Sequence, residues 1–179
     1  MKNTYMEDCA RAEGFSAAKV IETEKIVFDP GFRPYCEENI CGQYEVNYTC
    51  PPICGSPEFM KEKILQHKKA LVLETVCPVK DYYDTPAIRA GKTRHNQGTL
   101  RLLKKFRAEG CPGFMVGASG CSLCSPCRLG LGEECVFPDL KYSCMSAYCI
   151  YVKDLAEKCG MDYTPGEGKI SFFGMYVFD

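Results

Sequence analysis

The sequence contains no tryptophan, only two histidines and almost no net charge. Its 22 basic and 23 acidic residues give a formal charge of -1, so no overall field would draw it to nucleic acid or to an anionic membrane. No segment approaches the roughly 20 apolar residues of a transmembrane helix. The first residues also lack the basic and apolar regions of a secretory leader. We therefore expect a cytoplasmic protein that binds neither nucleic acid nor membrane.

Against these absences stand fourteen cysteines in a chain of 179 residues. A chain of this length can bury a hydrophobic core without disulfide bonds, because single domains typically span roughly 100–200 residues. In the reducing cytoplasm, clustered cysteines indicate metal ligands before they indicate disulfides. The sequence shows no repeat, linker or low-complexity tract, so we expect one metal-binding domain over residues 1–179.

Short apolar runs alternate with segments that carry helix-start signals, which is the pattern of an α/β layer fold. The apolar runs predict four strands, over residues 17–28, 70–76, 113–117 and 170–178. We therefore expect a single α/β domain with a small central sheet of about four strands and helices packed on it.

Capping residues and prolines predict where the helices begin. A Ser-Pro pair predicts a helix over residues 56–67, and a second helix is expected over 99–108 after Gly91 and Gly98 have divided the preceding segment. A serine cap predicts a last helix over 143–159. Both cysteine-rich segments fall in loops that follow a strand and precede a helix, where a rigid scaffold can hold ligands.

The most specific motif is C-x2-C-x2-C, formed by Cys121, Cys124 and Cys127, with Cys135 eight positions later. Two-residue gaps let three thiolates converge on successive irons of one cubane, and bacterial ferredoxins use the same triplet. Zinc would instead favour two separate C-x2-C pairs that supply four tetrahedral sulfurs. The spacing therefore favours a 4Fe-4S cluster, with Zn2+ as the alternative.

A second group of candidate ligands, Cys36, Cys41, Cys50 and Cys54, has the less regular gaps of four, eight and three residues. Proline follows Cys50 twice, which bars helix formation and favours an extended loop. The four cysteines could surround a second cluster, or three could bind it and leave one iron open to a substrate. Cys50 could also join the other group on one shared cluster. The number of clusters, one or two, and the ligand pairing stay open.

Two motifs carry a resemblance to a known family. They are Cys36, Cys41, Tyr44 and Cys50-Pro51-Pro52, and then Gly120-Cys121-Ser122-Leu123-Cys124 with Cys127 and Cys135. In these motifs, and over most of its length, the sequence resembles an uncharacterised family of predicted metal-binding, cysteine-rich proteins of anaerobic bacteria and archaea. The resemblance implies metal binding, with iron–sulfur favoured, and implies no particular reaction. Cys54 has no counterpart in the family pattern, which favours three ligands in the first group.

The remaining candidates have simpler interpretations. Cys149 and Cys159 fall on the apolar side of the last predicted helix and are expected to be core thiols. Cys9, Cys77, Cys111 and Cys144 have no partner at ligand spacing, and the two histidines are expected at the surface. A basic stretch contains Lys92, Arg94, Arg101, Lys104, Lys105 and Arg107. It is either the solvated face of a helix or a docking surface for an acidic redox partner.

Together these patterns predict an iron–sulfur protein that transfers single electrons between a low-potential donor and a redox partner protein in anaerobic metabolism. One alternative is an enzyme whose three-cysteine 4Fe-4S cluster binds a small-molecule substrate at an open iron. The other is a zinc-binding interaction module. No P-loop or dinucleotide motif is present, and the sequence indicates no oligomeric state.

Overall fold

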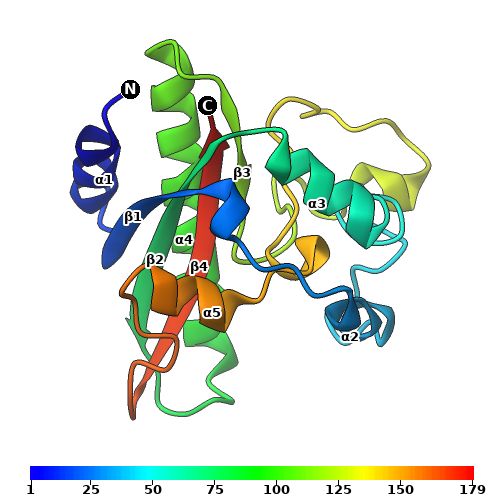
Figure 1. Ribbon diagram of the computed structural model, residues 1–179. Helices are drawn as coiled ribbons and strands as arrows, with labels where there is room; N and C mark the ends of the chain where they lie inside the picture. The colour runs from blue at the N-terminus through cyan, green and yellow to red at the C-terminus, as the bar shows by residue number, and fades with distance from the viewer.

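A four-stranded antiparallel sheet forms the centre of the computed structural model, which describes all residues from 1 to 179 (Figure 1). The strands are β1 (Ala17–Glu22), β2 (Lys69–Pro78), β3 (Gly113–Val116) and β4 (Lys169–Phe178). Their order is β1-β2-β4-β3, and every neighbouring pair is antiparallel. The single-domain α/β fold with about four strands is therefore confirmed.

Five α-helices surround this sheet. They are α1 (Asn3–Ala12), α2 (Arg33–Glu37), α3 (Pro57–Leu65), α4 (Thr85–Ala108) and α5 (Val152–Lys158). Figure 1 shows the long helix α4 behind the strands and α5 in front of them, with α2 and α3 to one side. No helix combines the length and the apolar character that a membrane span would need.

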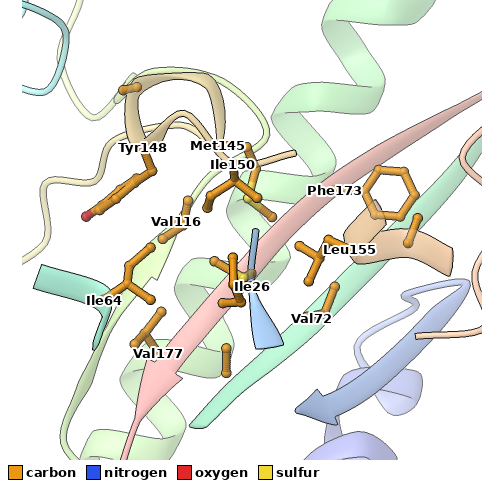
Figure 2. Close-up of a cluster of buried hydrophobic side chains, with 14 of the residues drawn as sticks. Ile26, Ile64, Val72, Val116, Met145, Tyr148, Ile150, Leu155, Phe173 and Val177 are labelled. Carbon is orange, nitrogen blue, oxygen red and sulfur yellow. The ribbon is translucent and has the colours of Figure 1, made fainter. Parts of the chain in front are cut away.

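Both faces of the sheet are covered by helices. Successive side chains of a strand point to opposite sides, so alternate residues of one strand pack into two different cores. In β2, Leu71 and Leu73 pack with α1 and α4, whereas Ala70 and Val72 pack with α3 and α5. Figure 2 shows the second of these cores, where Leu155 of α5 lies over the sheet. Burial on both sides explains why the central strands read as continuous apolar runs rather than as alternating ones.

Helix α4 contradicts the predicted division at Gly91 and Gly98, because it runs unbroken through both glycines. A Cβ atom at Gly91 would meet the ring of Phe172, and it would lie 2.9 Å from Sγ of Cys77. At Gly98 it would lie 3.0 Å from the ring of Phe15. Gly91 lets the helix approach the sheet closely, and Gly98 lets it approach Phe15, which precedes β1. This packing offsets the low helix propensity of both glycines.

The predicted last helix over 143–159 is also wrong, since only Val152–Lys158 is α-helical after a short 3-10 turn at Ser146–Tyr148. Cys149 has a φ of 55°, which breaks the helical path. The chain there pairs with the segment after β1, because the N–H of Asp29 donates to the carbonyl of Cys149 at 2.8 Å. The same segment shortens β1, which ends at Glu22 instead of residue 28.

Candidate metal centre

The two cysteine-rich loops meet at one cavity of about 940 Å3. Figure 1 shows the chain of both loops beside α2 and α3, to one side of the sheet. Seven cysteines line it: Cys36, Cys41, Cys50, Cys121, Cys124, Cys127 and Cys144. Six of these are candidates from the sequence motifs, and Cys144 is an addition that sequence spacing missed. All fourteen cysteines of the chain are free thiols. No three histidine, cysteine, aspartate or glutamate side chains are arranged closely enough to hold one metal ion.

The first loop leaves α2 at Cys36 and folds back on itself through three residues with left-handed backbone. These are Asn39, Gly42 and Glu45, with φ of 52°, 68° and 65°. The side chain of Asn39 supports the turn, since its Oδ1 accepts the N–H of Tyr44 at 3.0 Å. The turn carries Cys41 at the surface, and Cys50 lies buried at the loop's other end with 6% of its surface exposed.

Electrostatics group Cys36, Cys41 and Cys50 with Cys144; we call these four the first cysteine group. The pKa of Cys36 is raised to about 11 and that of Cys50 to about 12, mainly by burial and next by the negative charge of Cys144. The charge of Cys41 acts in the same direction on both. A cluster of thiols that resists ionisation in this way becomes a strong ligand set once a metal cation supplies the missing positive charge.

Cys121, Cys124, Cys127 and Cys135 form the second cysteine group. Burial raises the pKa of Cys121, the backbone N–H of Leu123 lowers it, and the charges of Cys124 and Cys135 raise it again. Cys135 does not line the cavity, but its effect on Cys121 places it within electrostatic range of that sulfur. A 3-10 turn at Arg128–Leu131 separates Cys127 from Cys135.

Buried polar side chains of the first loop hold the second loop in place. Nδ2 of Asn47 donates to the carbonyl of Cys121 at 3.2 Å, and the N–H of Cys121 donates to Oγ1 of Thr49 at 3.3 Å. Asn47 and Thr49 are also bonded to each other. A Cβ atom at Gly120 would lie 3.1 Å from Sγ of Cys50, so this glycine lets the second loop pass directly over that sulfur.

Cys144 reaches the site because its segment is pinned beside the end of β3. The N–H of Gly117 donates to the carbonyl of Ser143 at 2.9 Å, and the N–H of Met145 donates to the carbonyl of Gly117 at 3.1 Å. Asn96 of α4 fixes the same stretch, since its Oδ1 accepts the N–H of Ala118 at 2.9 Å. Cys144 stands alone in the sequence, so no spacing rule could have nominated it.

Cys54 does not line the cavity. Its thiol and that of Cys149 instead lie beside the guanidinium of Arg33. Arg33 is buried, donates from Nη2 to the carbonyl of Ala147 at 3.0 Å, and leaves Nε without a partner. It forms no ion pair with a carboxylate. Its positive charge lies near Cys36, whose pKa it lowers against the larger effect of burial.

The structure also tests the positions expected for Cys149, Cys159 and the two histidines. Cys149 is buried, and Cys159 packs against the core, as predicted for core thiols. The surface position predicted for His95 is wrong: the ring is 1% exposed beneath the sheet, with Nδ1 2.9 Å from Oγ1 of Thr75. His67 is partly exposed and pairs with Asp179 at 3.1 Å. His95 lies on the side of α4 that faces the sheet. The sequence pattern predicted a helix only over residues 99–108 in this region, so it did not assign His95 to a buried helix face.

Comparison with known proteins gives one match. The family described as predicted metal-binding protein (DUF2284), a domain of unknown function, matches residues 19–178. This range contains both cysteine groups and all four strands except the first two residues of β1. The expected membership of a family of predicted metal-binding proteins is therefore confirmed. No curated protein and no solved structure shows significant similarity to the chain.

Proposed function

Since the chain belongs to this family of predicted metal-binding proteins, we propose that its two cysteine groups bind two 4Fe-4S clusters and that the protein transfers single electrons. The supporting observation is that seven cysteines from three separate segments line one cavity. The proposal places the protein in the reducing cytoplasm, because thiols that serve as ligands must stay free of disulfides.

The residues present fit iron–sulfur clusters in their chemistry. The groups at the site are thiols, with no histidine in the cavity wall, and thiolate sulfur selects zinc, copper(I) or iron–sulfur clusters. Arg33 supplies a second argument, because a buried guanidinium without a carboxylate partner needs a nearby negative charge. An anionic cluster held by Cys36 would provide that charge.

Bound clusters would accept and release one electron at a time. The chain's own part is to hold two clusters at one cavity, so that an electron received at one cysteine group can leave from the other. Its wall also contains apolar residues, including Val46, Ala118 and Pro126, which limit water around the sulfurs. Ile40 is 88% exposed beside Cys41, so a redox partner protein has direct access to the first cysteine group.

Anaerobic purification followed by metal and sulfide analysis tests this proposal. We expect a brown protein with about eight irons and about eight sulfides per chain, and a paramagnetic spectrum after reduction. Cys124→Ala should remove about half of the iron, because it breaks only the second cysteine group. Cys159→Ala, which alters a cysteine outside the cavity, is the matched control and should keep the full iron content.

The zinc alternative makes the opposite prediction. A colourless protein with stoichiometric zinc and no sulfide would support a zinc-binding interaction module and exclude electron transfer. Loss of all iron from Cys124→Ala, with normal iron in the control, would indicate one shared cluster instead of two.

The size of the cavity favours a second candidate function. A volume of about 940 Å3 lies within the range of small-molecule pockets, roughly 300–1,000 Å3. An enzyme could use this space to bring a substrate to an iron that lacks a fourth cysteine. In that case the spectrum of the reduced protein should shift when the substrate is added.

A further inference from the structure

Lys92 of α4 is the only charged side chain among the 23 residues that line the cavity, apart from the thiols. No aspartate or glutamate lines the cavity. The ammonium group of Lys92 is thus the one fixed positive charge of the wall, and it attracts an anion more strongly where water is partly excluded. The wall is therefore suited to an anion.

Lys92 is also free of internal partners, because none of the nine ion pairs in the structure includes it. Arg89 and Arg94 on the same helix also form no ion pair and line a surface groove of about 690 Å3, although Nη2 of Arg94 donates to Sγ of Cys77 at 3.0 Å. Three cations without carboxylate partners thus lie along this half of α4. Such an arrangement raises the local concentration of anions next to the cavity.

Serine hydroxyls supply hydrogen-bond donors for such an anion. Ser119, Ser122, Ser125 and Ser146 all line the cavity. Oγ of Ser119 accepts from Nδ2 of Asn96 at 2.8 Å and donates a long hydrogen bond of 3.4 Å to the carbonyl of Gly120. Oγ of Ser122 lies 3.2 Å from the hydroxyl of Tyr142. A hydroxyl can donate one hydrogen bond and an ammonium can donate three, which suits the several oxygens of an oxyanion.

We infer that Lys92 and these serines bind a small oxyanion, a carboxylate or a phosphate, in the cysteine-lined cavity. This oxyanion would be the group by which the protein recognises a small-molecule substrate or effector next to its metal centre. The inference deepens the proposed function and rests on it for the presence of the clusters. The oxyanion site itself depends on Lys92, the serines and the cavity.

Calorimetric titration of the anaerobically purified holoprotein with inorganic phosphate and with acetate tests the inference, at constant ionic strength and with chloride as the reference anion. We expect saturable binding of phosphate or acetate and none of chloride. Lys92→Met should weaken that binding by about tenfold or more, because it removes the only cation of the wall. Lys92→Arg should restore most of it. Lys104→Met, at an exposed position of the same helix, is the matched control and should bind normally.

Absence of binding to the native holoprotein would overturn the inference, as would normal binding by Lys92→Met. A Lys92→Met protein whose reduction potential shifts while its affinity for phosphate and acetate stays unchanged would show that Lys92 only balances the charge of the clusters. Iron and sulfide measured on the same samples test the proposed function separately. Clusters without oxyanion binding would remove this inference alone, and oxyanion binding to a zinc protein would remove the electron-transfer proposal alone.

Discussion

A thiolate buried without a counter-charge is costly, and Cys144 shows how the chain limits that cost. Burial raises the pKa of Cys144, while the backbone N–H groups of Ala147 and Ser146 act on its sulfur and lower it. Hydrogen bonds of this kind support a sulfur that ligates a metal. Cys144 therefore has the surroundings of a ligand, although no sequence motif includes it.

We predict that Cys144→Ala removes about half of the bound iron, because the first cysteine group then has three sulfurs instead of four. The second group should keep its cluster, so that the iron content falls from about eight to about four per chain. Iron analysis after anaerobic purification measures this. Cys111→Ala, which alters a buried cysteine away from the cavity, provides the comparison. An unchanged iron content in Cys144→Ala would show that Cys144 is not a ligand.

His95 gives the fold a pH dependence of its own. Burial lowers the pKa of His95 to about 3, far below the ordinary value near 6.5. Between these two values the unfolded chain binds a proton that the folded chain does not, so the free energy of unfolding falls as the pH falls below about 6.5. From pH 7 to pH 5 this histidine alone should cost about 2 kcal/mol of stability.

The measurement compares urea unfolding of the native protein and of His95→Gln at pH 7 and at pH 5. Glutamine can still bond with Thr75 but does not titrate, so the variant should lose about 2 kcal/mol less than the native protein over this interval. An equal change in the free energy of unfolding between pH 7 and pH 5 for the native protein and His95→Gln would contradict the burial of a neutral His95.

At the scale of elements, the contact between α4 and the sheet decides how the site is positioned. Asn96 projects from α4 to the end of β3 and fixes the loop that carries Cys121. The helix can do this only if it lies close to the sheet, and Gly91 permits that approach. Helix packing and site geometry are therefore coupled.

We predict that Gly91→Ala lowers the free energy of unfolding by about 1–3 kcal/mol, because the new methyl group overlaps the ring of Phe172 and Sγ of Cys77. Intrinsic helix propensity alone would give the opposite sign, a gain of about 1 kcal/mol. Chemical denaturation distinguishes the two. Ala90→Gly at the exposed neighbouring position should cost about 1 kcal/mol through propensity only. A stabilised Gly91→Ala would mean that α4 lies farther from the sheet.

The elements that were predicted correctly are those in which the local sequence pattern, an apolar run or a helix cap, matches the way the element packs in the fold. Two-sided burial produces the apolar runs that indicated β2 and β4, whereas β1 alternates between buried and more exposed residues. The Ser-Pro signal located α3, where Oγ of Ser56 accepts the N–H of Phe59. The failures depend on tertiary contacts. Gly91 is explained only by the sheet beside it, Gly98 only by Phe15, and the left-handed Cys149 only by its pairing with the segment after β1.

The same limit applies to the candidate site. Spacing within each loop nominated Cys36, Cys41 and Cys50 on one side and the C-x2-C-x2-C triplet on the other, and the structure brings all six to one cavity. Spacing cannot show which loops meet, because that depends on buried contacts such as those of Asn47 with Cys121. For this reason Cys144, more than eighty residues from the first loop, could not be predicted.

At the scale of the whole molecule, the chain has two parts that differ in what stabilises them. The sheet has a hydrophobic core on each face, built from α1 and α4 on one side and from α3 and α5 on the other. The cysteine-rich loops have little regular structure, only α2 and short 3-10 turns. A loop with few apolar contacts depends on its metal for order, since the free energy of metal binding is then also its free energy of folding.

Removal of the metal should therefore disorder the loops and leave the sheet folded. We predict that chelation under anaerobic conditions makes chymotrypsin cleave about tenfold faster after Tyr44 and Tyr48, because opening of the loops determines cleavage there. Cleavage after Tyr82 and Tyr83, which are 70% and 90% exposed, should be unchanged and serves as the internal control. Hydrogen exchange should show that β2 and β4 keep their protection, since no candidate ligand is among the fully buried residues of the two cores that cover them. Equal loss of protection in the central strands would show that the metal centre stabilises the entire fold, and unchanged cleavage in the first loop would show that this loop is ordered without metal.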